Sequence, residues 1–354
     1  MNPNPTPNYP FNCWYVAARS QEIGSTPLGR RLLDIPVVLY RTGGGQVVAM
    51  ADRCIHRGYP LSGGTVAGDR LVCGYHGIGY GPDGRCVEVP SQDNVPLGAR
   101  VRAFPVLERD PLVWIWLGQP GAATLRTPPL TPWLTEPGWA SHGQQLHVKA
   151  NYLLLHEHYL DLTNVFAMHP ANVPPGMDRL PSLDEVEVSE MSVGYTRVLP
   201  PARLADWEAE ATGLPRQPEY HRREQGSFVS PALHVQRWII DTDNAGPFEH
   251  LRIHGFTPET PTTTHVFLHI AHNYATDRTL ISDHLRAFFL DMTRRDITVL
   301  ETVQRQLDEP HQPHRNINIK ADRAGLRARR VTQAMIAEET ARPTPTPNRH
   351  PLSV

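Results

Sequence analysis

Cys54–Gly58 (CIHRG) and Cys73–Gly77 (CGYHG) are the two short segments around which the rest of the chain can be interpreted. Each segment contains one cysteine and one histidine and ends in glycine, and sixteen residues lie between His56 and Cys73. A thiol and an imidazole occur together twice in one glycine-rich stretch, which is improbable by chance. The pattern predicts that two loops supply the two halves of one metal site.

The order of the ligands separates two kinds of metal site, because zinc sites with two cysteines and two histidines usually pair Cys with Cys and His with His. Here each segment carries a mixed pair. The thiolates of Cys54 and Cys73 can therefore bind one iron, and the imidazoles of the two loops can bind a second. With His56 and His76, this is the ligand set of a Rieske 2Fe-2S cluster, which we predict in preference to a structural zinc ion.

The composition is that of an ordinary globular protein. The 354 residues, 40% hydrophobic and 20% charged, allow two domains with a substantial core. A formal net charge of -2 gives no electrostatic support for nucleic acid or an anionic membrane as a partner. The other cysteines, Cys13 and Cys86, are too few for a disulfide framework, and the sequence has neither a signal-peptide pattern nor a membrane-spanning apolar run. We therefore expect a cytoplasmic protein.

Proline and glycine are concentrated between residues 120 and 138, which mark the expected boundary between two domains. We expect an N-terminal domain over residues 11–120 and a second domain over residues 121–340. The proline-rich tails, residues 1–10 and 341–354, are expected to be poorly ordered.

The N-terminal domain is predicted to be a small antiparallel β domain built from three hairpins. Val37–Tyr40 and Gln46–Met50 flank a Thr-Gly-Gly-Gly turn. Two further turns are expected at Pro82–Arg85 and at Arg109–Pro111, each between apolar strand-like segments. We expect this domain to hold the cluster between two loop tips.

The second domain is predicted to combine an antiparallel sheet with long helices. Strand-like segments cover residues 233–240, 251–256 and 264–271. Apolar residues at helical spacing cover Asn151–His169 and Thr279–Asp308. The predicted fold class is therefore α+β, with an all-β iron–sulfur domain followed by a sheet-and-helix domain.

The last predicted strand has two different faces. Apolar residues alternate with His265, Phe267 and His269 between residues 264 and 271. One face is therefore predicted to lie on the apolar core. The other face is expected to line a pocket or to be solvated, and for the histidines we favour solvent.

A carboxylate interrupts the apolar face of the helix expected over Thr279–Asp308, which we take as the final helix. Asp296 lies four residues after Met292 and four before Leu300 on that face. A carboxylate in apolar surroundings is costly unless it is paired or bound to a metal. By pattern alone, a salt bridge to an arginine is the commoner outcome.

Several segments outside the cluster loops resemble one protein family, the oxygenase component of Rieske non-haem iron oxygenases. The resemblance is to the vanillate and dicamba O-demethylase branch in particular. It covers nearly the whole chain, and its segments are Asn12–Ala17 (NCWYVA), Cys86–Pro90 (CVEVP), Leu112–Trp116 (LVWIW), Asn151–Tyr152 and Asp296 with its helix.

The resemblance implies two metal centres with separate tasks. Electrons from NADH would pass through a reductase or ferredoxin partner to the cluster, and then to a mononuclear ferrous iron that activates O2. In this family two histidines and one carboxylate hold that iron and leave coordination positions open. The carboxylate carries over to Asp296 and the second histidine to His169. The resemblance also implies a homotrimer in which Asp161 hydrogen-bonds His76 of the neighbouring subunit.

At the position of the first histidine ligand this sequence has Asn164, and three explanations remain open. Asn164 binds iron through its amide oxygen, His158 supplies the missing imidazole, or the site holds no iron. Asn164 and His169 are five residues apart, about 7.5 Å along a helix, whereas His158 and His169 would be roughly 16 Å apart. Position favours Asn164 and ligand chemistry favours His158. We rank direct or water-bridged coordination by Asn164 first, His158 second and loss of iron third. His156 is expected to be a packing or surface residue.

The predicted activity is O2-dependent and NADH-dependent monooxygenation of a small aromatic compound, by demethylation or hydroxylation. His234, His254 and Phe288 are candidates for the lining of the substrate pocket. The alternative is an electron-transfer or regulatory protein that keeps its cluster beside a degenerate oxygenase domain. The sequence does not name the substrate.

Overall fold

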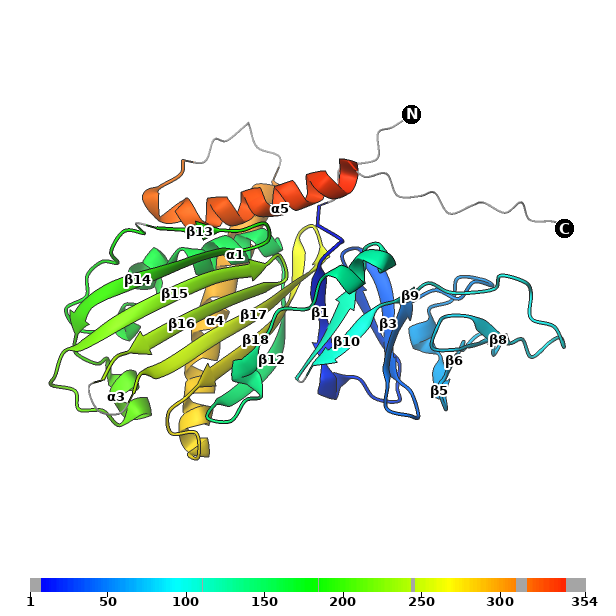
Figure 1. Cartoon of the computed structure of the whole chain (residues 1–354), viewed down its shortest axis with the longest axis horizontal. Coiled ribbons are helices and arrows are strands. Elements are labelled where there is room, and N and C mark those ends of the chain that lie inside the picture. The colour runs from blue at the N-terminus through cyan, green and yellow to red at the C-terminus, as the bar shows by residue number, and fades with distance from the viewer. Residues whose placement is uncertain (1–7, 110, 184, 243–245, 310–316, 342–354) are drawn as a thin grey trace.

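The computed structural model describes residues 8–109, 111–183, 185–242, 246–309 and 317–341. It has a smaller lobe of short strands and a larger lobe with a seven-stranded sheet and helices (Figure 1). The predicted α+β class is confirmed. Most of the two predicted tails lies outside the described residues, and the domain limits at 11, 120 and 340 remain predictions.

The N-terminal lobe consists of three small antiparallel sheets with the orders β1-β11-β10, β2-β3-β4-β9 and β5-β6-β7-β8. Their strands are β1 (Trp14–Arg19), β2 (Leu28–Leu32), β3 (Ile35–Arg41), β4 (Val47–Ala51), β5 (Thr65–Ala67), β6 (Arg70–Val72), β7 (Gly79–Tyr80), β8 (Cys86–Glu88), β9 (Ala103–Phe104), β10 (Val106–Arg109) and β11 (Leu112–Trp116). The three predicted hairpins are confirmed as the pairs β3–β4, β7–β8 and β10–β11. Asp110, in the third predicted turn, lies outside the described residues.

The larger lobe is organised by one antiparallel sheet with the strand order β12-β18-β17-β16-β15-β14-β13. The strands are β12 (Ala140–Val148), β13 (Glu187–Val188), β14 (Val193–Ala202), β15 (Tyr220–Ser230), β16 (Leu233–Ile240), β17 (Phe248–Thr260) and β18 (Thr263–His272). The three strands predicted from the sequence fall within β16, β17 and β18 at the centre of this sheet.

Helices cover one face of the large sheet (Figure 1). They are α1 (Tyr152–Leu160), α2 (Val165–Met168), α3 (Asp206–Thr212), α4 (Thr279–Asp308) and α5 (Arg323–Ala341). Contacts place α1 over β15, β16 and β17, and α4 over β12 and β18. The helix predicted over residues 279–308 is confirmed with the same limits.

The prediction that this helix is the final one is wrong, because α5 follows it and packs across α1. Several buried positions of α5 are small residues such as Ala324 and Ala328, so the sequence shows little apolar contrast there. An ion pair fixes the contact, because the Arg329 guanidinium donates to both carboxylate oxygens of Glu157, at 2.7 and 2.9 Å.

The helical pattern over residues 151–169 does not form one continuous helix. α1 ends at Leu160, and Asp161 takes an extended conformation with φ −118° and ψ 101°. The Asp161 carboxylate accepts the backbone N–H of Thr163 at 2.9 Å. This local hydrogen bond competes with continuation of the helix. A short 3-10 turn and α2 follow, so the chain changes direction between the two halves of the segment.

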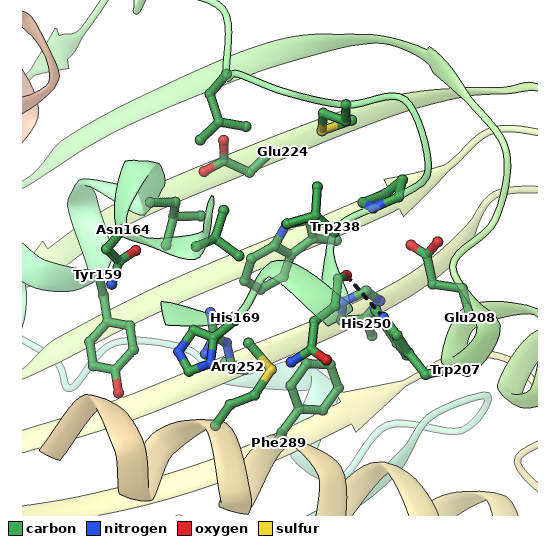
Figure 2. A pocket seen from close by; sticks show the side chains of 18 of the residues that line it. Tyr159, Asn164, His169, Trp207, Glu208, Glu224, Trp238, His250, Arg252 and Phe289 are labelled. Carbon is green, nitrogen blue, oxygen red and sulfur yellow. Dashed lines mark hydrogen bonds between the residues drawn. The ribbon is translucent and has the colours of Figure 1, made fainter. Parts of the chain in front are cut away.

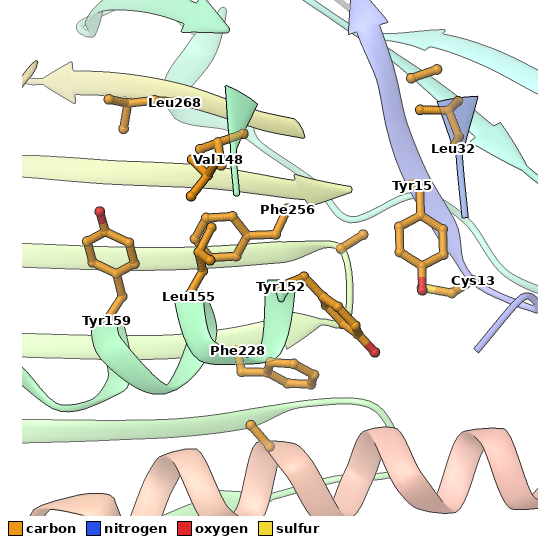
Figure 3. Close-up of a cluster of buried hydrophobic side chains, with 14 of the residues drawn as sticks. Cys13, Tyr15, Leu32, Val148, Tyr152, Leu155, Tyr159, Phe228, Phe256 and Leu268 are labelled. Atoms are coloured by element: carbon orange, nitrogen blue, oxygen red, sulfur yellow. The ribbon is translucent and has the colours of Figure 1, made fainter. Parts of the chain in front are cut away.

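The helix-covered face of the sheet forms the main apolar core (Figure 3). Tyr152, Leu155 and Tyr159 of α1 lie against the sheet residues Phe228 and Phe256. Full burial of an aliphatic or aromatic side chain of this size contributes about 1.5 to 3 kcal/mol relative to exposure. This contact fixes the orientation of α1 and of its last turn.

The opposite face of the sheet packs on the N-terminal lobe through a second apolar cluster. Leu233, Val235 and Ile253 of the sheet contribute to it, together with Trp14 and Trp114 of the smaller lobe. The two lobes therefore share an apolar interface in which tryptophan supplies much of the buried area.

The predicted alternation along β18 is present, but its second face is not solvated as we expected. Phe267 belongs to the apolar cluster shared with the N-terminal lobe. His265 and His269 are only 7% and 2% exposed. Burial lowers the pKa of each histidine to about 4. The sequence could not show that a second lobe covers this face.

Candidate metal centres and substrate cavity

The two loops that carry the predicted cluster ligands fold alike. In the first, the N–H of Gly58 donates to the carbonyl oxygen of Cys54 at 2.9 Å, and in the second, Gly77 donates to Cys73 at 3.0 Å. Both glycines have a φ of 71°, which favours glycine because other residues are strained there. The same turn is therefore used twice, once for each Cys/His pair.

The four candidate cluster ligands divide into two buried thiols and two exposed imidazoles. Cys54 and Cys73 are 3% and 2% exposed. The exposed rings of His56 and His76 have centroids 4.6 Å apart. Burial raises the pKa of the Cys73 thiol, and the neighbouring Cys54 thiol raises it further. Two adjacent thiols on the protein side and two imidazoles on the solvent side form a donor set that fits a 2Fe-2S cluster.

A second group of candidate ligands comes together between α1, α2 and α4. His169 Nε2 lies 2.8 Å from Asp296 Oδ1, and His158 Nε2 lies 3.4 Å from the same oxygen. Two donors that bind one first-row metal at about 2.1 Å and at right angles stand about 3 Å apart. The spacing of these three side chains is therefore close to that of neighbouring ligands of one metal ion.

The side chains of His158 and His169 contact the Asp296 carboxylate directly in this structure. No group of three or more His, Cys, Asp or Glu side chains in the described ranges is arranged to hold a metal ion as it stands. The Tyr159 hydroxyl donates to Asp296 Oδ2 at 3.3 Å. A metal ion held by these side chains would replace the direct contacts of His158 and His169 with Asp296.

Asp296 is an anion in these surroundings, although it is only 2% exposed. Burial acts to raise its pKa, but hydrogen bonds from His158 and His169 and the nearby charge of Arg252 hold the pKa well below its ordinary value. The salt bridge expected from the sequence pattern is a distant one, because Arg252 Nη1 lies 4.0 Å from Asp296 Oδ2.

Asn164 lies beside His158. Its Nδ2 is 3.2 Å from Nε2 and 3.4 Å from Nδ1 of that ring. The separation of roughly 16 Å that counted against His158 assumed an unbroken helix. That premise is wrong, since α1 ends before Asp161 and His169 lies 2.8 Å from Asp296 of α4. His156 is a packing residue as expected, because it is fully buried and its Nε2 is 3.1 Å from the carbonyl oxygen of Pro231.

A cavity of about 850 Å³, including its open mouth, has Asp296 in its lining. Figure 2 shows the cavity with His169 and Trp207 among the side chains around it. Aromatic side chains give it flat walls, and charged or titratable side chains reach it from the sheet and helices. The aromatic residues are Tyr159, Trp207, Trp238, Phe288 and Phe289, and the charged or titratable ones are His158, His169, Glu208, Arg222, Glu224, His250, Arg252 and Asp296.

Of the three residues predicted to line the substrate pocket, Phe288 lines this cavity, whereas His234 and His254 do not, and the contact of Phe288 with substrate stays a prediction. Both histidines point to the helix side of the sheet, but the described cavity lining does not include them. His254 is covered by α1, where its ring stacks on Tyr159 with centroids 4.2 Å apart. The cavity opens along the same face of β17, at His250 and Arg252. The two-residue repeat along this strand identifies those positions, but not where the helix stops covering them.

Comparison with known proteins matches a family model to each of the two parts of the chain. Residues 13–105 match the Rieske 2Fe-2S domain, and residues 148–338 match the vanillate O-demethylase oxygenase C-terminal domain. The chain belongs to the Rieske oxygenase family.

Curated relatives of this Rieske oxygenase match it over most of their length. The toluene-4-sulfonate monooxygenase system iron-sulfur subunit TsaM1 of Comamonas testosteroni is 33% identical over 89% of this chain and 93% of its own. The oxygenase component of dicamba O-demethylase from Stenotrophomonas maltophilia is 33% identical over 83% and 88%. The crystal structure of dicamba monooxygenase bound to 3,6-dichlorosalicylic acid has a TM-score of 0.86, with 29% identity over 94% and 99%.

The cofactors predicted for this Rieske oxygenase are confirmed through the family. A Rieske 2Fe-2S domain is present, and a structure of dicamba monooxygenase with non-haem iron and dicamba matches the chain with a TM-score of 0.82 at 27% identity. The chain is a monooxygenase component that receives electrons from NADH through a reductase. None of the helices in the described part of the chain is both long and apolar enough to cross a membrane.

Asp161 occupies the break between α1 and α2 in this Rieske oxygenase. It is partly exposed, and its Oδ1 accepts hydrogen bonds from the backbone N–H and the hydroxyl of Thr163 at 2.9 and 2.7 Å. Asp161 therefore caps the 3-10 turn that follows α1. Its predicted role as a bridge to the cluster of a neighbouring subunit concerns the assembly and stays a prediction.

Proposed function

We propose that this Rieske oxygenase demethylates or hydroxylates a small aromatic compound, using O2 and electrons from a reductase or ferredoxin partner. The observation that carries the proposal is the convergence of His158, His169 and Asp296 at one side of an aromatic-walled cavity. Two imidazoles and one carboxylate are the donor set of non-haem ferrous oxygenases. The relatives named for toluene-4-sulfonate, dicamba and vanillate support an aromatic substrate.

The mononuclear iron is held by His158, His169 and Asp296, with Asn164 as a neighbour of the site. An imidazole nitrogen is a stronger ligand for ferrous iron than an amide oxygen. The helix break removes the distance that favoured Asn164, and the His158 ring reaches Asp296 Oδ1. His158 and Asn164 have in effect exchanged places relative to the family pattern. When bound, the iron supplies the activation of O2.

The protein contributes binding and orientation to this chemistry. Trp207, Phe288 and Phe289 form a contiguous aromatic wall, with Trp207 stacked on Phe288 at 4.8 Å between ring centroids. The loop after α2 adds Val173 and Met177 to the lining. A flat aromatic substrate between these groups is surrounded by apolar surface, which excludes water from the reacting atoms.

A homotrimer supplies the electron path. The cluster loops adjoin the β5–β8 sheet, at the end of the N-terminal lobe farthest from the large sheet (Figure 1). Electron transfer to the mononuclear iron from the cluster of a neighbouring subunit avoids the long path between the two metal centres of one chain. The exposed ring of His76 and the partly exposed carboxylate of Asp161 support such a contact between subunits.

The compartment that suits this oxygenase is the cytoplasm. Cys13, Cys54, Cys73 and Cys86 are all free thiols. A reducing compartment keeps the two cluster ligands available for iron, and it also contains the NADH that the reductase uses.

Iron content separates this proposal from an electron carrier with a degenerate oxygenase domain. We expect about three iron atoms per chain, two in the cluster and one at the second site. With a reductase and NADH, a suitable aromatic compound should also increase O2 consumption. A protein whose cluster is reduced but which retains about two iron atoms per chain and consumes no O2 would contradict the proposal.

A further inference from the structure

Tyr159 is a buried phenol near the end of α1 whose hydroxyl reaches the Asp296 carboxylate. It is 3% exposed and belongs to the cavity lining. The hydroxyl donates to Asp296 Oδ2 at 3.3 Å, and Figure 2 shows it directed toward α4, the helix that carries Asp296. A hydrogen bond between two oxygens is usually about 2.7 to 2.8 Å long, so this bond is a weak one. The hydroxyl is therefore a group that can orient the carboxylate without neutralising it.

The two oxygens of Asp296 have different partners. Oδ1 faces the imidazoles, because His169 Nε2 lies 2.8 Å from it and His158 Nε2 lies 3.4 Å from it. Oδ2 faces the Tyr159 hydroxyl and Arg252, whose Nη1 is 4.0 Å away. A metal ion held by the two imidazoles and the carboxylate would therefore meet Oδ1. The donors on the other side favour Oδ2 as a hydrogen-bond acceptor.

Packing leaves the Tyr159 ring little freedom to move away from Asp296. The ring stacks on His254 with centroids 4.2 Å apart and planes 24° apart, and it lies nearly parallel to Phe256 at 6.0 Å. Neither ring nitrogen of His254 has a hydrogen-bond partner among the described residues, so contacts between rings hold this histidine. The Arg252 guanidinium carbon lies 5.4 Å from the Tyr159 centroid. A side chain enclosed in this way can keep a metal ligand in one orientation.

His158 and Tyr159 are consecutive residues that contact different oxygens of Asp296. Their rings are almost perpendicular, at 89°, with centroids 4.9 Å apart. The imidazole lies beside Oδ1 and the phenol beside Oδ2. α1 ends one residue later, at Leu160. The last turn of α1 therefore supplies a proposed iron ligand and, next to it, a group that orients a second ligand.

We propose that Tyr159 is a positioning residue that makes Asp296 bind the mononuclear iron through one oxygen, Oδ1. The hydrogen bond to Oδ2 disfavours rotation of the carboxylate into a position where both oxygens bind the metal. One carboxylate oxygen occupies one coordination position and two oxygens occupy two, so Tyr159 keeps an additional position open for O2. The inference rests on the proposed function for the iron at Asp296, and it adds a residue that controls how this iron is held.

The coordination mode can be measured on the full-length protein with its cluster intact and Co²⁺ in place of the mononuclear iron. Co²⁺ follows Fe²⁺ closely in its affinity for such sites. X-ray absorption at the cobalt edge reports the second site alone, because the cluster contains iron. The distance from the metal to the carboxyl carbon is longer when one oxygen binds than when both do. We expect the longer distance in the wild type and a shift to the shorter distance in Tyr159→Phe.

Binding of nitric oxide to the ferrous protein tests the consequence for the open positions. Nitric oxide is a stable substitute for O2, and its adduct with the mononuclear iron has an EPR signal, whereas the oxidised cluster has none. Tyr159→Phe should weaken nitric oxide binding by about 10-fold, equivalent to about 1.4 kcal/mol, because the second carboxylate oxygen then competes for the position. The iron content should stay at about three atoms per chain.

Tyr152→Phe is the matched control. Tyr152 lies on the same helix and is 1% exposed, and its hydroxyl has no hydrogen-bond partner among the described residues. Both substitutions remove one buried phenol oxygen, but only Tyr159→Phe removes a contact with Asp296. The metal–carbon distance and the nitric oxide affinity should therefore be unchanged in Tyr152→Phe. The visible spectrum of the cluster reports folding of both variants.

Three results would overturn the inference. The wild type could bind Co²⁺ through both oxygens of Asp296, a result that needs no variant. Tyr159→Phe could leave the metal–carbon distance and the nitric oxide affinity unchanged, or Tyr152→Phe could change both as much as Tyr159→Phe does. A wild type that binds no metal ion at Asp296 would overturn the proposed function as well. Retained metal without O2 consumption would contradict the proposed function alone.

Discussion

Replacement of His158 by alanine should remove the mononuclear iron and leave the Rieske cluster in place. His158 Nε2 lies 3.4 Å from Asp296 Oδ1, beside the 2.8 Å contact of His169. Loss of one imidazole leaves two protein ligands, which are too few to retain ferrous iron against dilution. We expect the iron content to fall from about three to about two atoms per chain, while the cluster spectrum is unchanged.

Asn164→Ala is the matched control for His158→Ala. Asn164 lies in the same segment, and its amide lies 3.2 Å from His158 Nε2, so both substitutions disturb the same contact. Only the histidine substitution should release iron. Loss of iron from Asn164→Ala but not from His158→Ala would identify Asn164 as the ligand. If neither variant loses iron, both assignments are wrong.

The cluster loops are the part of the site that the sequence predicts most completely. Each loop needs only a cysteine, a histidine and a glycine within five residues, and Gly58 and Gly77 take the left-handed conformation in both turns. The information is local, because each turn is closed by one hydrogen bond to its own cysteine. No distant part of the chain has to be known.

The second site could be predicted only in part, because it depends on where a helix ends. His169 and Asp296 follow from the family pattern and lie together as expected. The ranking of Asn164 above His158 as an iron ligand assumed that the segment of apolar spacing over residues 151–169 forms one helix. The hydrogen bond from Thr163 to Asp161 interrupts it, and periodicity does not reveal such a competing local bond.

The lining of the substrate cavity could also be predicted only in part, because alternation along a strand does not show which of its residues a helix covers. Alternation along β16 and β17 puts His234, His254 and Arg252 on the helix side of the sheet. Alternation could not show that α1 covers His254 and leaves Arg252 uncovered. The length and direction of α1, set by tertiary packing, decide which polar residue is a core residue and which lines the cavity.

Replacement of Asp161 by asparagine should slow electron transfer from the cluster to the mononuclear iron while both metal centres are retained. Asp161 Oδ1 accepts from Thr163, and an amide oxygen can accept the same hydrogen bonds, so the helix break should persist. The substitution removes the charge that would hold an imidazole N–H of His76 from the neighbouring subunit. A carboxylate in that position fixes the orientation and basicity of the ring, and its loss commonly costs about 10- to 100-fold.

Reoxidation of the reduced cluster by O2, followed by stopped-flow absorbance in the presence of substrate, measures this step. The rate should fall in Asp161→Asn, whereas reduction of the cluster by the reductase should keep its normal rate. Thr163→Ala separates the two roles of the aspartate, because it removes the hydroxyl donor at 2.7 Å and leaves the carboxylate charge. Equal slowing in both variants would make Asp161 a helix cap and not a bridge. Slowing in Asp161→Asn alone, with three iron atoms retained, would connect the charge of Asp161 to the passage of the electron between subunits.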